Sequence, residues 1–194
     1  MKQQPLLIIF VKNPEKGKVK TRLAKDVGDD RALEIYKQLL DHTHSITTHL
    51  SMEKHVYYSQ NIIDGDIWDI GNYKKFVQEG IELGDKMSAA FKRSFPEGAR
   101  PVCIIGSDCL ELSEQIIRDA FESLKTHDFV IGPAKDGGYY LLGMKQFHPQ
   151  IFENKTYSTS SVYDEAQAEI SKLGKSLHIL PTLSDIDQIE DLNR

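Results

Sequence analysis

Residues 6–23 read LLIIFVKNPEKGKVKTRL and join an apolar run directly to a strongly basic one. The six residues Leu6–Val11 are all aliphatic or aromatic, which is typical of a buried strand. From Lys12 to Lys25 the chain carries six basic residues and one acidic residue, although its formal net charge is −5. This stretch therefore predicts a first strand that leads into a cationic loop.

Short apolar runs alternate with helical periodicity along the rest of the chain. Further strands are predicted at residues 55–58, 76–77, 102–105, 129–131 and 139–142. Helices are predicted at residues 29–46, 82–95 and 113–127, each with an apolar stripe that we assign to the core. This alternation predicts a three-layer α/β/α fold around a mostly parallel mixed sheet. In such open sheets, ligands bind beyond the carboxyl ends of the strands.

Length and composition predict one globular domain over residues 1–194. Hydrophobic residues make up 40% and charged residues 27% of the chain, and its negative balance argues against a nucleic-acid or membrane-surface binder. The apolar run Leu6–Val11 is too short for a signal peptide core or a membrane span. Cys103 and Cys109 are too few for a disulfide framework. We therefore expect a cytoplasmic protein.

The cationic loop is the first of three polar clusters that follow predicted strands. Its lysines, Gly17 and Arg22 provide ammonium charges, backbone N–H groups and a bidentate donor, which suit a polyphosphate. The spacing of a P-loop is absent. The alternative is a solvated surface loop, because exposed lysines are common.

The second cluster lies in 102-VCIIGSDCLELS-113, where an apolar run ends in Gly-Ser-Asp. A carboxylate in this position can hold Mg²⁺ (or Mn²⁺) while the metal keeps waters and substrate phosphates as its other ligands. Asp108 is the first candidate ligand, and Glu111, a little further along the chain, either reaches the same ion or faces solvent. The alternative role for Asp108 is an Asx-turn or a helix cap.

The third cluster is 129-FVIGPAKDGGYYLLGM-144, in which Asp136-Gly137-Gly138 separates two predicted strands. Asp-Gly is a strong signal for a hairpin turn, whereas paired glycines also allow a ligand to approach the backbone closely. Tyr139 offers a further contact. Near the C-terminus, 185-DIDQIEDL-192 supplies Asp185 and Asp187, either of which is a candidate second metal ligand or a helix cap.

The chain resembles the DUF2064 family, also called rSAM/selenodomain-associated transferase 1, whose members are proposed glycosyltransferases. The resemblance rests on five stretches in the same order: 10-FVKNPEKGKVKTRLA-24, 83-LGDKM-87, 105-IGSDCLEL-112, 132-GPAKDGGYYLLG-143 and 184-SDIDQIEDL-192. It implies the GT-A-like fold of the nucleotide-diphospho-sugar transferase superfamily. More distantly, 20-KTRL-23 is similar to phospholactate guanylyltransferases. The ending is similar to other nucleotidyltransferases, except that Gln188-Ile189 replaces their Thr-Pro.

The resemblance and the residue patterns together define one expected site. Catalytic roles fall to Lys20, Arg22 and Asp108, and the metal ligands are Asp108 and Asp187. The nucleotide contacts Lys12, Gly17, Lys18, Lys20, Thr21, Arg22 and Ser107. The acceptor, a small molecule, contacts Asp136, Gly137, Gly138 and Tyr139.

Two transfer reactions fit this site, and both depend on positioning and electrostatic stabilisation. The first passes a sugar from a nucleotide sugar, and the family resemblance favours it. The second passes a nucleotidyl group from an NTP to a phosphorylated acceptor. It is favoured by the cationic loop and by Gly106-Ser107-Asp108, which lacks the first carboxylate of a D-x-D pattern. A non-catalytic nucleotide-binding regulator is the alternative from another class.

Overall fold

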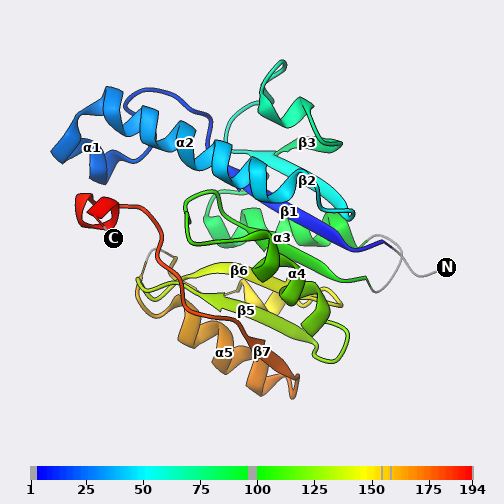
Figure 1. The fold of residues 1–194 in the computed structure, drawn as a ribbon. Coiled ribbons are helices and arrows are strands. Elements are labelled where there is room, and N and C mark those ends of the chain that lie inside the picture. Colours follow the sequence, from blue (N-terminus) through cyan, green and yellow to red (C-terminus); the bar gives the residue numbers. More distant parts are fainter. Residues whose placement is uncertain (1–3, 96–99, 154, 158, 194) are drawn as a thin grey trace.

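A seven-stranded sheet forms the centre of the protein in a computed structural model, which describes residues 4–95, 100–153, 155–157 and 159–193 (Figure 1). Its spatial order is β3-β2-β1-β4-β6-β5-β7, and β6 is antiparallel to both of its neighbours while all other pairs are parallel. The strands are β1 (Leu6–Val11), β2 (Glu53–Tyr58), β3 (Tyr73–Val77), β4 (Val102–Ile105), β5 (Phe129–Pro133), β6 (Tyr139–Met144) and β7 (Leu177–Ile179).

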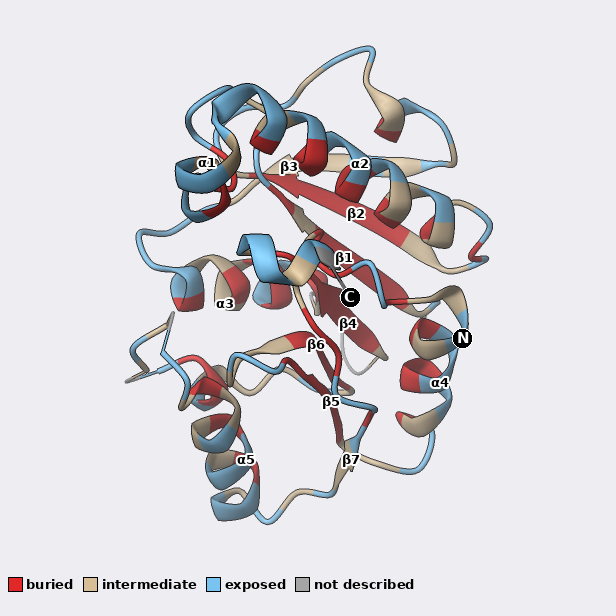
Figure 2. Cartoon of the chain, turned by 60° about the vertical axis from the view of Figure 1, so that its left-hand side comes forward, coloured by how far each residue is buried: buried red, intermediate tan, exposed pale blue. Residues whose placement is uncertain are grey.

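Helices cover both faces of this sheet. The helices α1 (Thr21–Val27), α2 (Asp29–Thr47) and α4 (Glu114–Ser123) pack on one face, and α3 (Leu83–Ser94) and α5 (Val162–Lys172) pack on the other. Figure 2 shows the buried strands between these helices. Short 3₁₀ turns lie at η1 (Ile67–Asp69), η2 (Pro149–Ile151) and η3 (Ile189–Asn193). The predicted three-layer α/β fold with a mostly parallel mixed sheet is confirmed.

The composition of β1 follows from its central position. Leu7 and Ile9 pack with the helices of one face, whereas Leu6 and Ile8 pack with those of the other. Successive strand residues point to opposite faces, and a strand covered on both sides therefore needs apolar residues at every position.

The chain reverses its direction of travel across the sheet between β1 and β4. From β1 it moves outward to β2 and β3, and it then returns through α3 to place β4 on the other side of β1. Ile9 of β1 lies opposite Ile105 of β4 in a parallel pair. The loops that follow β1 and β4 therefore leave the same edge of the sheet side by side, at the kind of switch point where α/β proteins bind ligands.

The segment of residues 180–187, which we call the C-terminal segment, returns from β7 to this edge. The backbone N–H of Leu180 donates to Ile131 O (2.8 Å), and that of Leu183 donates to Pro133 O (3.1 Å). Further on, the backbone N–H of Ile186 donates to Asp108 O (2.9 Å). The C-terminal segment is thus hydrogen-bonded first to β5 and then to the loop after β4.

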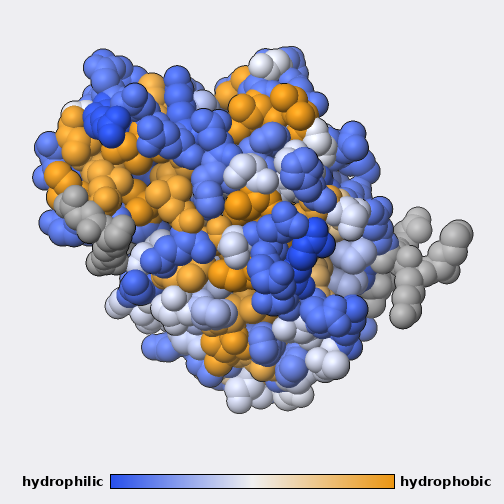
Figure 3. All heavy atoms as spheres, viewed as in Figure 1, coloured by the Kyte–Doolittle hydropathy of each residue, from blue (hydrophilic) through white to orange (hydrophobic). Residues whose placement is uncertain are grey.

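Three elements differ from the sequence predictions: α1, α5 and β7 were not predicted. The seven-residue α1 buries only Leu23, which is too little to produce a periodic signal. Within the described residues, no helix is long and apolar enough to cross a membrane. In the view of Figure 3, hydrophilic residues cover much of the surface, and apolar residues gather over α1 and α2.

Candidate functional site

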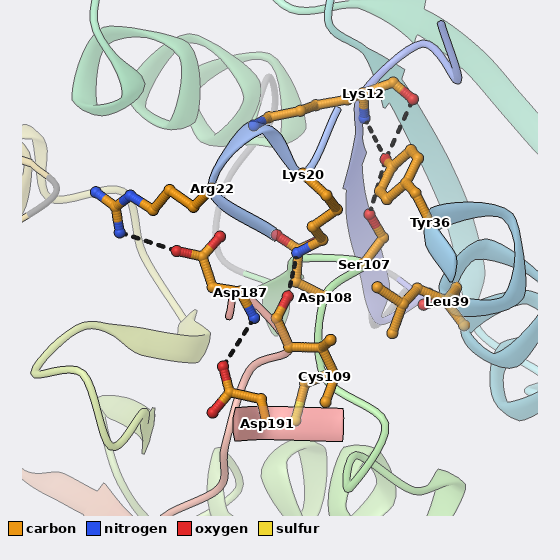
Figure 4. Close-up of polar contacts among 12 residues, drawn as sticks. Lys12, Lys20, Arg22, Tyr36, Leu39, Ser107, Asp108, Cys109, Asp187 and Asp191 are labelled. Atoms are coloured by element: carbon orange, nitrogen blue, oxygen red, sulfur yellow. Dashed lines mark hydrogen bonds and ion pairs between the residues drawn. The ribbon is translucent and has the colours of Figure 1, made fainter. Parts of the chain in front are cut away.

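Lys20 lies at the centre of the site and is held in an unusual conformation. It precedes α1 with φ 48° and ψ 43°, in the left-handed region that few non-glycine residues occupy. Its side chain is buried, and its Nζ donates to Ile186 O (2.6 Å) and pairs with Asp108 Oδ1 (3.0 Å). The ammonium group therefore joins the loops after β1 and β4 to the C-terminal segment (Figure 4).

Carboxylates surround this ammonium group. The side chain of Asp108 is 43% exposed, and Asp185 is likewise partly buried. Burial, followed by the charges of Asp108 and Asp136, raises the pKa of Asp185 to about 7, while Lys20 acts in the opposite direction. Two carboxylates, one from the loop after β4 and one from the loop after β5, thus act electrostatically on the carboxyl group of the C-terminal segment.

These carboxylates have the chemistry that Mg²⁺ requires. Hard oxygen donors suit this ion, which typically takes one or two carboxylates and completes its shell with water and substrate phosphates. Among the described residues, no group of three or more His, Cys, Asp or Glu side chains is preassembled around a metal position. Asp108 and Asp185 are therefore candidate ligands for an ion whose remaining ligands would come with a substrate.

Arg22 forms the second link between the cationic loop and the C-terminal region. Its Nη1 pairs with Asp187 Oδ2 (2.8 Å), and both side chains remain partly exposed. The carboxylate of Asp191 accepts the backbone N–H groups of Asp187 (3.0 Å) and Gln188 (2.9 Å), which fixes this turn. Of the two candidate second ligands, Asp187 is thus paired with an arginine and Asp185 is coupled to Asp108.

The loop after β1 is tied to the loop after β4 through Tyr36 of α2. The backbone N–H of Lys12 donates to the hydroxyl of Tyr36 (2.7 Å), which also lies 3.3 Å from the buried Ser107 Oγ. Burial and the charge of Asp108 raise the pKa of Tyr36 well above its usual value. The exposed ammonium group of Lys12 makes no hydrogen bond or ion pair with the described residues.

The remaining residues of the cationic loop lie nearer to solvent. Lys18 pairs with Glu15 (2.5 Å), and Lys16 pairs with Asp30 (2.7 Å). Gly17 has φ 76° and is exposed, as is Thr21 at the start of α1. The structure thus brings Lys20 and Arg22 to the carboxylates and leaves Lys18 on the outer side of the loop.

The Asp136–Gly138 turn connects β5 to β6, as expected for an Asp-Gly hairpin. Asp136 Oδ1 accepts the backbone N–H of Gly138 (2.8 Å). Gly137 has φ 90°, and a Cβ built there would lie 2.1 Å from Ser160 O. The hydroxyl of Tyr139 points into the α3 side of the sheet, toward Met87 Sδ (3.8 Å). Asp136 is close enough to raise the pKa of Asp185, whereas Tyr139 contributes to the opposite layer.

Sequence reasoning did not find two residues that shape the site. Tyr36 was assigned to the apolar stripe of its helix. Its hydroxyl group, on a face predicted to be buried, was the feature that distinguished it from the other residues of that stripe. Asn13 directly follows β1, is buried, and its side-chain amide donates to Asn61 O (2.8 Å). Its carboxamide oxygen accepts the backbone N–H of Gln60 (3.0 Å). The sequence signal for Asn13 was its position as a polar residue between Lys12 and Pro14, directly after the predicted strand.

Comparison with known proteins places the chain in a family. Residues 42–159 match the family described as "Uncharacterized protein conserved in bacteria (DUF2064)". The chain belongs to the DUF2064 family. The resemblance noted in the sequence is therefore confirmed. No curated protein matches the chain.

Solved structures show the same fold. A proposed nucleotide-diphospho-sugar transferase from Desulfovibrio desulfuricans G20 is 31% identical, with a TM-score of 0.91, and the match covers 100% of this chain and 86% of that one. The 4-diphosphocytidyl-2C-methyl-D-erythritol synthase of Anaerococcus prevotii DSM 20548 is 12% identical, with a TM-score of 0.60 and coverage of 98% and 95%. Rv0371c of Mycobacterium tuberculosis H37Rv, solved as a manganese complex, is 10% identical, with a TM-score of 0.58 and coverage of 100% and 98%.

The stretch that matches the DUF2064 family contains only part of the site. Ser107, Asp108 and Asp136 lie within residues 42–159, whereas Lys20 and Asp185 lie outside them. The match with the Desulfovibrio protein extends over the whole chain. The structure joins these regions through the contacts of Lys20 with Asp108 and Ile186.

Proposed function

We propose that this DUF2064 protein is a metal-dependent transferase whose substrate is a nucleotide or nucleotide sugar. The observation that carries the proposal is the contact between Lys20 Nζ and Asp108 Oδ1 (3.0 Å), beside Asp185, at the adjoining carboxyl ends of β1 and β4. A polyphosphate with a divalent cation has the two charges that this mixture of ammonium and carboxylate groups would bind.

Each side of the site has a role in this proposal. Asp108 and Asp185 would hold Mg²⁺ or Mn²⁺, which supplies positive charge that stabilises the phosphate leaving group. Lys20 and Arg22 would exchange their carboxylate partners for phosphate oxygens, and Lys12 adds an ammonium group at the exit of β1 that is not paired with any of the described residues. Ser107, Gly17, Lys18 and Thr21 complete the proposed nucleotide side.

Two transfers remain open for this site. In glycosyl transfer, an acceptor oxygen bonds to the anomeric carbon of the donor sugar. The bond from that carbon to the diphosphate breaks, and the diphosphate keeps the electron pair. In nucleotidyl transfer, an acceptor phosphate oxygen bonds to the α-phosphorus of an NTP, and pyrophosphate leaves with the electron pair. In both, the charge that Lys20 and Arg22 stabilise develops on phosphate oxygens.

A ligand panel tests the proposal. We expect the melting temperature to rise with at least one NTP or nucleotide sugar in the presence of Mg²⁺, because a ligand that binds the folded state stabilises it. Release of pyrophosphate would identify nucleotidyl transfer, and release of a nucleoside diphosphate would identify glycosyl transfer. Binding without any product would favour a regulator. If no nucleotide changes the melting temperature, the proposal is wrong.

A matched pair of variants connects the result to the site. Asp108→Asn keeps the size of the side chain but removes its charge, and we expect it to abolish Mg²⁺-dependent turnover without unfolding the protein. Asp119→Asn changes an exposed carboxylate of α4 and serves as the control. Full turnover in Asp108→Asn would exclude Asp108 as a metal ligand.

A further inference from the structure

A cleft lies between α3 and the two strands at one edge of the sheet, β2 and β3. Its volume of about 420 Å³ is in the usual range for a small-molecule site. We call it the β3–α3 cleft, and the described residues that line it are Tyr57, Val77, Glu79, Ala89, Ala90, Lys92 and Arg93. None of these residues belongs to the candidate functional site.

A buried hydroxyl group without a hydrogen-bond partner belongs to the wall of this cleft. Tyr57 is only 3% exposed, and its Oη makes no hydrogen bond with the described residues. Ser94 is close enough to influence the pKa of Tyr57, but the Ser94 hydroxyl donates to Ala90 O (2.8 Å). Buried polar groups are almost always hydrogen-bonded, so an unpartnered one indicates a water or a ligand that binds there.

The same face of β2 carries a second unpartnered atom. His55 precedes Tyr57 by two residues, and side chains at this spacing point to the same face of a strand. Its Nε2 lies 2.9 Å from Glu53 Oε1, whereas its buried Nδ1 has no partner among the described residues. The described residues contain three such atoms, and two of them therefore lie on the strand face beside the cleft.

Arg93 places a guanidinium group over the same aromatic cluster. Its Cζ lies 4.5 Å from the ring centroid of Phe76, and that ring stacks on the ring of Tyr57 at 5.0 Å. A guanidinium held by its flat face keeps its N–H groups available at the edge. Its Nη1 makes one long contact with Glu79 Oε1 (3.5 Å), and no other N–H of this group has a partner among the described residues. The guanidinium is thus oriented but nearly unpaired.

The lining of the β3–α3 cleft combines positive charge with small apolar side chains. Lys92 is exposed, and its ammonium group makes no hydrogen bond or ion pair with the described residues. Glu79 is the one carboxylate among the described lining residues, and the remaining wall is formed by Val77, Ala89 and Ala90. The cleft is therefore cationic in a chain whose net charge is −5.

We propose that the β3–α3 cleft binds a small molecule that carries a carboxylate or phosphate group on a compact apolar body. A guanidinium binds either oxyanion through paired N–H donors, and Lys92 adds a second positive charge. The Tyr57 hydroxyl would donate to an oxygen of the same molecule, and the alanines of α3 would contact its apolar body. This site requires neither a metal nor a nucleotide, and it does not depend on the proposed transferase function.

Pairs of small probes test the need for an anion. Benzoate is compared with benzamide, and phenyl phosphate with phenol, by chemical-shift mapping of the backbone amides of Val77, Ala89 and Ala90 in metal-free buffer. We expect the anionic member of at least one pair to shift these amides and to bind at least about tenfold more tightly than the neutral member. The pair with the larger preference identifies the oxyanion as carboxylate or phosphate. Unchanged amides with every probe, or equal binding of both members in both pairs, would overturn the proposal.

A charge-removing variant locates the bound anion. Arg93→Gln is expected to weaken binding of the preferred probe at least about tenfold, because it removes the paired charged donors. Arg118→Gln removes the same charge from an exposed position on α4 and should leave the affinity unaltered. Lys20→Met should also leave it unaltered. If Lys20→Met weakens binding as much as Arg93→Gln does, the anion binds at the candidate functional site and the proposal is wrong.

A matched pair of tyrosine variants separates a ligand-binding hydroxyl from a structural one. Tyr57→Phe is expected to weaken binding of the probe at least about threefold and to leave the melting temperature of the free protein unchanged or raised, because it removes an unpartnered buried group. Tyr140→Phe removes a hydroxyl that donates to Pro181 O (2.9 Å), and it should lower the melting temperature without changing the affinity. Unchanged affinity in Tyr57→Phe would mean that the protein or a water satisfies this hydroxyl, which contradicts the proposal.

Discussion

Lys20 combines a strained backbone with a buried charge, and both point to a role in binding. A left-handed conformation costs a non-glycine residue on the order of 1 kcal/mol, and such conformations cluster at functional sites. We expect Lys20→Met to weaken nucleotide binding at least tenfold, roughly the effect of losing one charged hydrogen bond. Calorimetric titration of the Mg²⁺–nucleotide complex measures the change.

The control for Lys20 comes from the same loop. Lys16 pairs with Asp30 in an exposed position, and Lys16→Met removes an equal charge from the loop. We expect its affinity to stay within about twofold of the wild type, because exposed pairs and charges contribute little. Equal losses in both variants would mean that general loop charge, rather than the buried ammonium group, holds the nucleotide.

Asp185 makes a testable contribution to pH dependence. Its pKa is about 7 in the folded protein, above the ordinary value of 3.8. Between these values the folded state binds more protons than the unfolded state, so the free energy of unfolding falls as the pH rises from about 4 to 7. The groups that face this carboxyl are Asp108, Asp136, Asp187 and Lys20.

Replacing Asp185 by asparagine removes this titration. In metal-free buffer we expect Asp185→Asn to be more stable than the wild type at pH 8, by on the order of a few kcal/mol, and about equal to it near pH 4. Urea unfolding at several pH values measures the difference. If the difference in the free energy of unfolding between the variant and the wild type is the same at pH 4 and pH 8, the pKa of Asp185 is not raised.

The β5–β6 hairpin depends on Gly137 for both its backbone and its packing. Gly137→Ala would place a methyl group against Ser160 O at a φ of 90°. We expect a loss of about 3 kcal/mol in the free energy of unfolding, since strain and a backbone clash add. Gly174→Ala is the matched control, because Gly174 has φ 64° and nothing within 4 Å of the added Cβ. It should lose only about 1 kcal/mol. Similar losses would show that packing against Ser160 is unimportant.

Elements with strong local patterns were predictable from the sequence. The strands β1 and β4 and the helix α2 lie where the apolar pattern of the sequence predicted them. Burial of fixed faces determines both that pattern and the element it produces. In contrast, α5 buries only Val162, Ala166 and Ile170, and the three residues of β7 are half-buried or exposed. Their stability comes from packing on elements distant in sequence, which a local pattern does not record.

The same distinction applies to the candidate site. Lys20, Arg22 and Asp108 were recognisable because each follows or lies near the end of a predicted strand. The different surroundings of Asp185 and Asp187 were not recognisable, because they depend on how the C-terminal segment crosses the loop after β4. The side chain of Asp187 reaches Arg22, whereas the charge of Asp108 helps to raise the pKa of Asp185. This difference arises from tertiary contacts alone.

At the scale of the whole molecule, charge balance predicts a strict need for a divalent cation. The chain has a net charge of −5, and the cations of the site are opposed by nearby carboxylates. A polyphosphate therefore gains little electrostatic attraction until a metal neutralises those carboxylates. We expect EDTA to lower nucleotide affinity at least tenfold, as measured by calorimetric titration.

Removing the opposing charges supplies the converse experiment. The double variant Asp108→Asn/Asp185→Asn should bind the nucleotide in EDTA more tightly than the wild type does, although it should lose its response to Mg²⁺. If the variant and the wild type bind equally in EDTA, these carboxylates do not oppose the phosphates.

The hydrogen bond from Lys20 to Ile186 joins residues 166 positions apart. Contacts of such long range form late in folding, because most of the chain must first be ordered to bring their ends together. An intermediate containing only β1, β2 and β4 would possess neither Asp185 nor the carbonyl that fixes Lys20. Binding of the proposed nucleotide would thus report completed folding, because a partly folded chain lacks the groups that we propose to hold it.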